Sequence, residues 1–209
     1  MAERLLPVVT SYAEVYARFR WHIPPMFNIG VDACDRHADD PSRLAMIYED
    51  EAGHVSTHSF AEFRARSNQL AHALLRLGIR RGDRVGIILS QRPETAVAHL
   101  AAYKLGAIAL PLATLFGPDA LDYRLRDAGA KVVVTDTESL DRVLGVRDGL
   151  PALQHVICVD RADAAGILDY QRLLADAPEA FTPVRTAADD PALLIYTSGT
   201  TGPPKGHRH

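Results

Sequence analysis

The sequence predicts an α/β fold, a mostly parallel sheet with helices on both faces. From residue 84 onward, short apolar runs alternate with amphipathic segments of helical spacing. Glycine marks the expected end of two of these helices, at Gly106 and Gly129, and of the helix before residue 84, at Gly78. The chain has 209 residues, and 47% of them are hydrophobic, which is enough to bury a sizeable core. Strands alternating with helices pair in parallel through right-handed crossovers, so helices cover both faces of the sheet.

Residues 44–58 are the first segment of regular structure that the sequence predicts. Apolar runs at 44–49 and 55–58 flank a polar turn at 50–53, as in a β-hairpin. Ser59 and Glu62 then form an S-x-x-E capping box at the start of a helix that ends at Gly78. The apolar positions of this helix recur every three or four residues, at Phe60, Phe63, Leu70, Leu74 and Leu77.

The alternation of strand and helix follows from residue 84 to residue 196. Strands are predicted at 84–89, 107–112, 131–135, 156–159 and 192–196. Helices are predicted at 94–105, entered at Pro93, at 119–128, after the N-cap Asp136 and near 170–174. The chain therefore divides into an irregular arm (1–43), an α/β subdomain (44–190) and a strand followed by a glycine-rich loop (191–209).

Charge and composition exclude several classes of partner. A net charge of −3 and a pI near 6.3 give no basic surface for nucleic acid. The longest uncharged apolar run is too short to cross a bilayer and no signal peptide is evident, so we expect a cytoplasmic protein. Cys34 and Cys158 form no C-x-x-C pair and are expected to be reduced, partly buried thiols.

The stretch from Tyr196 to Gly206 reads YTSGTTGPPKG and predicts a phosphate-binding loop. Glycines at 199, 202 and 206 allow positive φ and a close approach of backbone N–H groups to a ligand. Lys205 is one of three lysines, against twenty arginines, and supplies a point charge suited to a polyphosphate. A solvated linker is the alternative, but such linkers rarely follow a buried strand. Hydroxyl donors are expected from Thr197, Ser198, Thr200 and Thr201.

This loop is not a G-x-x-x-x-G-K-[ST] loop, because Pro204 and Gly206 occupy two of its defining positions. It closely resembles the signature loop of the adenylate-forming superfamily, which includes acyl-CoA synthetases, luciferases and the adenylation domains of peptide synthetases. Residues 27–30, 32–37 and 106–121 resemble the acetyl- and medium-chain acyl-CoA synthetase branch. The resemblance implies the N-terminal part of the acetyl-CoA synthetase-like fold.

The resemblance also implies a reaction, in which a carboxylic acid attacks ATP, pyrophosphate leaves, and the acyl group passes from the adenylate to coenzyme A. Mg²⁺ and the loop would stabilise the phosphate charge. The implied phosphate-binding residues are Thr197, Ser198, Gly199, Thr200, Thr201, Gly202 and Lys205. No catalytic or metal-ligating side chain is assigned. The acid could be a fatty acid, an acetate-like acid or an aromatic acid such as benzoate.

Relatives in this superfamily continue past the loop into an adenine pocket, a ribose-binding aspartate and a C-terminal domain with a catalytic lysine. We therefore expect the chain to be the N-terminal part of a longer enzyme and to be inactive alone. Surfaces left exposed would favour self-association. The alternative function is a non-catalytic nucleotide-binding or interaction module that another chain completes.

Other conspicuous residues receive ordinary interpretations. His207 and His209 lack a third metal ligand and are expected to form a disordered end. Asp189 and Asp190 precede Pro191 and suit a solvated turn into the last strand. An arginine cluster is expected to favour a helix C-terminus and remain solvated, at Arg76, Arg80, Arg81 and Arg84.

Overall fold

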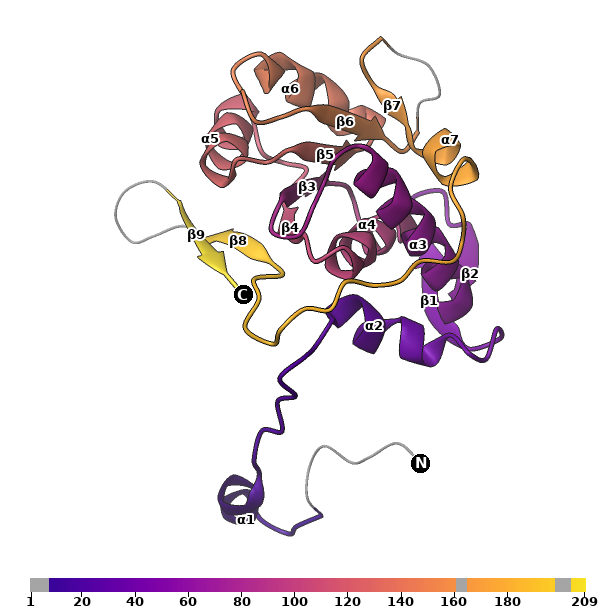
Figure 1. Ribbon diagram of the computed structural model, residues 1–209, viewed down its shortest axis with the longest axis vertical. Coiled ribbons are helices and arrows are strands. Elements are labelled where there is room, and N and C mark those ends of the chain that lie inside the picture. The colour runs from indigo at the N-terminus through magenta and orange to yellow at the C-terminus, as the bar shows by residue number, and fades with distance from the viewer. Residues whose placement is uncertain (1–7, 161–164, 198–203) are drawn as a thin grey trace.

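A five-stranded parallel sheet lies at the centre of the computed structural model, which describes residues 8–160, 165–197 and 204–209 (Figure 1). The strand order is β4-β3-β5-β6-β7, and every neighbouring pair is parallel. The strands are β3 (Arg84–Ile88), β4 (Ile108–Pro111), β5 (Val132–Thr135), β6 (His155–Cys158) and β7 (Leu168–Asp169). The predicted parallel sheet is confirmed, whereas the two-residue β7 was not predicted.

Helices cover both faces of this sheet, as predicted. The helices α3 (Phe60–Arg76) and α4 (Pro93–Lys104) pack on one face, with α7 (Tyr170–Ala175) against α3. The helices α5 (Pro118–Ala128) and α6 (Thr137–Arg147) pack on the other. A hydrophobic core lies on each face of the sheet, and successive strand residues point into opposite cores. Val132 and Val134 therefore lie in the core beneath α3 and α4, and Val133 lies in the core beneath α5 and α6. Because both faces are covered, the strands β3 to β6 are mostly apolar, with polar residues such as Arg84, Thr135 and His155 at their ends.

The predicted caps set most of the helix boundaries. Asp136 accepts a hydrogen bond from the backbone N–H of Ser139 at 2.9 Å and begins α6. Gly129 ends α5 in the left-handed conformation, with φ of 60°. Only half of the capping box at α3 forms. Ser59 accepts from the N–H of Glu62 at 3.2 Å, whereas the Glu62 carboxylate lies 3.0 Å from His58 Nδ1 instead of returning to the Ser59 backbone.

The N-terminal arm contains two short helices, α1 (Tyr12–Arg18) and α2 (Ile29–Ala33), and a 3₁₀ turn at Asp35–His37. None of the residues of α1 is buried, and this helix projects away from the body (Figure 1). The predicted hairpin then forms from β1 (Leu44–Glu49) and β2 (Val55–Ser59). Its outer surface carries exposed apolar side chains, with Ile47 65% and Val55 62% exposed.

The C-terminal segment forms a second hairpin. The strand β8 (Leu194–Thr197) pairs antiparallel with β9 (Lys205–Arg208). A parallel bridge between Leu193 and Ala109 places β8 beside β4, outside the five-stranded sheet. The expectation of a disordered end was wrong, because the His209 backbone bonds to Leu193 in both directions, at 2.8 and 2.9 Å. This pairing satisfies backbone groups that a free end would leave to water.

The arginine cluster binds backbone carbonyls at the ends of helices. Arg80 donates to Leu75 O at 2.7 Å, near the end of α3. Arg84 donates to Ala128 O and Gly129 O at the end of α5. Arg81 pairs with Asp190, whose carboxylate also accepts from the N–H of Ala187 at 2.7 Å.

Within the described ranges, no helix is both long and apolar enough to cross a membrane.

Candidate functional site

The two ends of the predicted phosphate loop lie opposite each other in the β8–β9 hairpin. Thr197 is the last residue of β8, Lys205 is the first of β9, and the two are direct partners across the strands. Both are exposed. The structure therefore brings these two predicted residues together. The remaining predicted residues lie outside the described part of the chain: Ser198, Gly199, Thr200, Thr201 and Gly202.

The hairpin presents different residues on its two faces. Residues alternate along each strand, so Thr197 and Lys205 share one face. On the opposite face, Leu194 is buried and Tyr196 is half-buried. Since β8 runs parallel to β4, its carboxyl end points the same way as the carboxyl ends of the central strands. Ligands of open α/β sheets bind at this end.

Helix α5 holds both stems of the loop. The hydroxyl of Tyr123 donates a hydrogen bond to Pro204 O at 3.0 Å. The hydroxyl of Tyr196 donates to the Asp127 carboxylate, one turn further along α5. The residue before the loop and the residue before Lys205 are therefore both tied to the same helix. Sequence reasoning missed this role of Tyr123 and Asp127, because both lie outside the apolar spacing of α5.

An aromatic and cationic stack reinforces the contact between α5 and β8. The Arg124 guanidinium lies 4.1 Å from the Phe116 ring centroid and 5.9 Å from that of Tyr196. The rings of Tyr123 and Tyr196 meet edge to face at 6.3 Å. Burial, followed by the hydrogen bond to Asp127, raises the pKa of Tyr196 above its ordinary value. Tyr196 therefore stays protonated and acts as a donor at neutral pH.

Gly206 has a different role from the one predicted. It is absent from the described glycines with positive φ, so it does not supply the predicted conformational freedom. A Cβ at this position would lie 3.1 Å from both Leu194 Cδ1 and Tyr196 Cζ. Such a contact is tighter than ordinary packing allows. Glycine at 206 therefore lets the Tyr196 ring lie across the partner strand.

Lys205 differs from the other two lysines in its surroundings. Lys104 Nζ lies 2.7 Å from Asp35 Oδ1, and Lys131 Nζ lies 2.8 Å from Asp83 Oδ1. Among the residues that the structure describes, Lys205 makes no ion pair. Its exposed ammonium group is therefore available to an anionic ligand.

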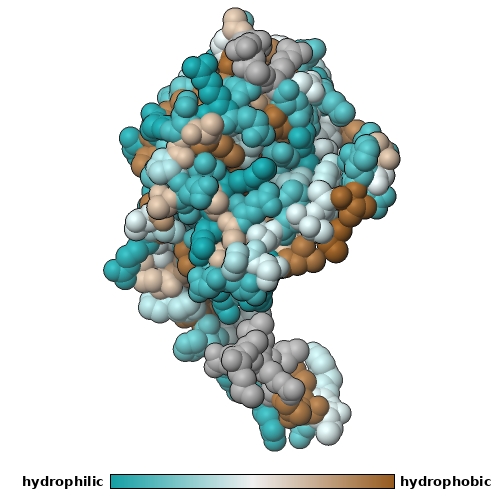
Figure 2. Space-filling model, turned by 90° about the vertical axis from the view of Figure 1, so that its right-hand side faces the viewer, coloured by the Kyte–Doolittle hydropathy of each residue, from teal (hydrophilic) through white to brown (hydrophobic). Residues whose placement is uncertain are grey.

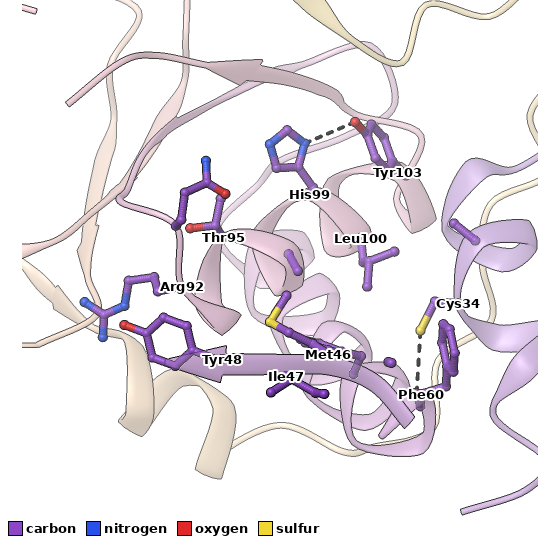
Figure 3. Close-up of a pocket in the computed structure, with 15 residues that line it drawn as sticks. Cys34, Met46, Ile47, Tyr48, Phe60, Arg92, Thr95, His99, Leu100 and Tyr103 are labelled. Carbon is purple, nitrogen blue, oxygen red and sulfur yellow. Dashed lines mark hydrogen bonds between the residues drawn. The ribbon is translucent and has the colours of Figure 1, made fainter. Parts of the chain in front are cut away.

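A cavity of about 680 Å³ opens elsewhere, between α4 and the β1–β2 hairpin (Figure 3). None of its lining residues comes from the segment 191–209. It is therefore separate from the loop.

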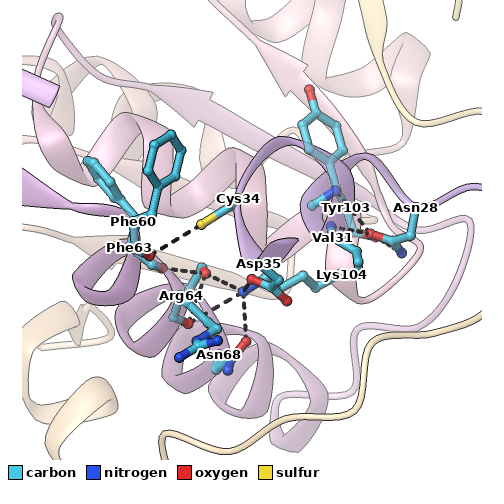
Figure 4. Close-up of polar contacts among 12 residues, drawn as sticks. Asn28, Val31, Cys34, Asp35, Phe60, Phe63, Arg64, Asn68, Tyr103 and Lys104 are labelled. Atoms are coloured by element: carbon cyan, nitrogen blue, oxygen red, sulfur yellow. Dashed lines mark hydrogen bonds and ion pairs between the residues drawn. The ribbon is translucent and has the colours of Figure 1, made fainter. Parts of the chain in front are cut away.

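The buried Lys104 joins the N-terminal arm to α3 and α4 (Figure 4). Besides the ion pair with Asp35, its ammonium donates to Ser67 Oγ at 2.8 Å and Asn68 Oδ1 at 2.7 Å. Burial lowers the pKa of Lys104, whereas Asp35 opposes this shift. A fully buried ammonium is tolerated only with such partners. This cluster therefore links the N-terminal arm to α3 and α4.

The segment 27–30 completes this link. Asn28 caps α2 by accepting from the N–H of Gly30 at 3.0 Å. Its side-chain amide donates to Tyr103 O at 2.8 Å and Val184 O at 3.0 Å. A Cβ on Gly30 would lie 2.8 Å from Lys104 Cγ. Two of the segments that carry the resemblance thus meet at the end of α4.

No group of three or more His, Cys, Asp or Glu side chains in the described residues could hold a metal ion. Cys34 and Cys158 are both free, and they are fully buried, whereas partial burial was predicted.

A family model described as "AMP-binding enzyme" matches residues 34–209. Acetyl-coenzyme A synthetase of Bacillus subtilis (strain 168) is 37% identical, over 95% of this chain and 37% of its own length. Acetyl-coenzyme A synthetase of Laribacter hongkongensis (strain HLHK9) is 32% identical, over 91% of this chain and 32% of its own. The chain thus spans about a third of the length of the curated relatives it matches.

Solved structures agree with these matches. The crystal structure of Brucella canis acyl-CoA synthetase superimposes with a TM-score of 0.86 at 26% identity. The match covers 96% of this chain and 38% of that one. The anthranilate CoA ligase AuaEII in complex with anthranoyl-AMP gives a TM-score of 0.79 at 30% identity, over 90% and 35% of the two chains.

Proposed function

Because this chain belongs to the AMP-binding enzyme family, we propose that it forms the N-terminal, phosphate-binding part of an enzyme that activates a carboxylic acid with ATP. The acid would become an acyl-adenylate, and its acyl group would then pass to coenzyme A. The observation that carries this proposal is the pairing of Thr197 with Lys205 across the two stems of the loop. The names of the relatives, acetyl-coenzyme A synthetase and acyl-CoA synthetase, support the reaction type.

In this proposal, Lys205 attracts the polyphosphate of ATP and Thr197 donates a hydrogen bond to it. A lysine ammonium on a flexible stem suits a ligand whose charge is spread over several oxygens. The side chains share one exposed face at the carboxyl end of β8. As pyrophosphate leaves, negative charge grows on its oxygens, and fixed positive charge lowers the energy of that state. We also propose phosphate contacts for Ser198, Gly199, Thr200, Thr201 and Gly202.

Two further ligands belong to the proposal. Coenzyme A would be the acyl acceptor. Mg²⁺ would accompany ATP, bound to its phosphate oxygens. We favour a fatty acid as the acid, with acetate-like and aromatic acids as alternatives.

Titration calorimetry with Mg-ATP tests the role of Lys205. We expect the Lys205→Ala variant to bind Mg-ATP about tenfold more weakly than the parent, because a charge-assisted contact is lost. Arg208→Ala is the matched control. Arg208 is also exposed on β9, but it lies on the opposite face of the hairpin, so its removal takes away one positive charge without touching the proposed site. Equal weakening in both variants would point to general electrostatics and contradict the assignment.

We further infer that these 209 residues, tested as they stand, do not form an acyl-adenylate. They span about a third of the length of the relatives that they match. ATP–pyrophosphate exchange dependent on an added acid measures this directly. Mixtures should include acetate, octanoate and benzoate. Exchange above the level without acid would refute the inference and identify the acid class.

A further inference from the structure

The cavity beside α4 has the size of a small-molecule site. Its volume of about 680 Å³ lies within the range of about 300–1,000 Å³ that is usual for such sites. The α4 helix forms one wall and β1 the other, with the ends of α2 and α3 closing one end (Figure 3). It lies apart from the loop stem and contains no residue of the proposed phosphate site.

One end of this cavity is apolar. Its lining there includes Met46, Phe60, Leu100 and Cys34. Burial raises the pKa of the Cys34 thiol to about 11, so the group is uncharged at neutral pH. The thiol donates to Phe60 O at 3.6 Å. Met46 is an adaptable side chain that accommodates apolar groups of varied shape. This end therefore suits an aliphatic or aromatic body.

The opposite end is polar, and its charges are unequal. Arg92 lines the cavity, and its guanidinium is held by two carboxylates, Glu94 at 2.7 Å and Asp160 at 2.9 Å. The three side chains together carry a net charge of −1, and Arg92 is the one among them that lines the cavity. His99 adds no positive charge at this end, because burial lowers its pKa and favours the neutral ring. A ligand carboxylate at this end would have to compete with Glu94 and Asp160 for a guanidinium that they already hold.

The other polar groups at this end offer hydrogen-bond acceptors. The Thr95 hydroxyl donates its proton to Ser90 O at 2.7 Å, which leaves its oxygen lone pairs for a ligand. Tyr48 also lines this end, and its hydroxyl has no hydrogen-bond partner among the described side chains and backbone groups. Such a hydroxyl both donates and accepts.

We propose that this cavity binds an apolar molecule whose polar head donates a hydrogen bond and carries no negative charge, such as an alcohol or an amine. The apolar body lies against Met46, Phe60 and Leu100, and the head lies near Thr95 and Tyr48. A carboxylic acid in its ionised form is rejected. The cavity is therefore not a second site for the acid that the proposed reaction consumes.

Three probes with one chain length test the selectivity by calorimetry: octan-1-ol, octylamine and octanoate. We expect octan-1-ol and octylamine to bind with Kd on the order of 1 mM or tighter, and octanoate to bind at least about tenfold more weakly. Octanoate binding as tightly as octan-1-ol would overturn the proposal, and so would the absence of binding by all three. No probe carries a phosphate, so the outcome is independent of the ATP site.

Two variants locate the binding. Ala96→Trp fills the cavity from α4 and should abolish octan-1-ol binding. Ala65→Trp, at a half-buried α3 position that does not line the cavity, should leave it unchanged. Unchanged binding in a folded Ala96→Trp protein would overturn the proposal.

Glu94→Gln removes one of the two carboxylates beside Arg92 and provides a test that does not depend on filling the cavity. We expect octanoate to bind about tenfold more tightly to this variant, while octan-1-ol binding stays within about twofold. An unchanged ratio of the two affinities would overturn the charge argument, whether or not the tryptophan variant folds.

Discussion

Gly30 controls how closely the N-terminal arm approaches the buried Lys104. A Cβ at position 30 would lie 2.8 Å from Lys104 Cγ and 3.1 Å from Leu100 O. The first contact is with a side chain already fixed by Asp35, Ser67 and Asn68, so neither neighbour can move freely. The arm and α4 therefore meet at a position that admits no side chain.

We expect Gly30→Ala to lower the free energy of unfolding by about 1–3 kcal/mol, the usual cost of overpacking a filled core. Urea unfolding of the two proteins measures the difference. Gly145→Ala is the control, because Gly145 lies within α6 and a Cβ at that position would have no neighbour within 4 Å. That variant should be neutral or slightly more stable, since alanine favours a helix. Equal effects of both changes would contradict the packing argument.

Single contacts such as Asp35 with Lys104 were beyond prediction from the sequence. The two residues are far apart in the chain, and neither spacing nor composition distinguishes this carboxylate from the others. The close approach at Gly30 is equally invisible without the path of α4. Lys205 was easier to single out, because it follows an apolar run within a glycine-rich stretch.

Helix α5 positions the loop stem through hydrogen bonds from side chains on its exposed side. We expect Tyr123→Phe to remove the bond to Pro204 O and to weaken the local stability of the β8–β9 hairpin by about 1 kcal/mol. Hydrogen exchange at the backbone amides of 205–208 should then be about fivefold faster. Tyr103→Phe serves as the control, since its hydroxyl bonds to His99 within α4 and not to the hairpin.

At the scale of elements, boundaries followed from local chemistry wherever a cap or glycine was present. Asp136 and Gly129 are examples, because each acts within its own turn of helix. The strands β7 and β9 were not predicted. β9 is entirely exposed and reads KGHR, so it has no apolar pattern, and its extended form comes from pairing with β8. A strand that depends on its partner in this way can be identified from the tertiary structure but not from its own sequence.

For the molecule as a whole, the exposed apolar side chains predict association. Hydrophobic residues gather at mid-height on the face in Figure 2, the side on which the β1–β2 hairpin lies in Figure 1. On this hairpin, Ile47 is 65% exposed and Val55 is 62% exposed. Such surfaces favour reversible contacts between copies.

We expect the average mass in sedimentation velocity to rise with concentration, from the low to the high micromolar range. Ile47→Lys should lower this tendency, because a charge in the contact must be desolvated. Gln171→Lys adds the same charge at an exposed position on α7 and should have no effect. A constant monomer mass at all concentrations would contradict the expectation.

At the scale of the whole molecule, the five-stranded sheet was the feature that the sequence predicted best. Its strands place apolar side chains on both faces and alternate with amphipathic helices. The placement of β8 was less predictable. A run of apolar residues predicts a strand, but it does not say which edge the strand joins or whether a following segment folds back on it.

The pairing of β8 with β9 has a consequence for the length of the loop. Thr197 and Lys205 stay paired as long as β8 and β9 stay hydrogen-bonded, so the segment between them is a loop whose two ends are held together. The entropic free-energy cost of closing such a loop grows only slowly with its length, by roughly 0.6 kcal/mol for each doubling. Residues can thus be added or removed at the tip with little loss of stability, while the lysine remains in register with the threonine.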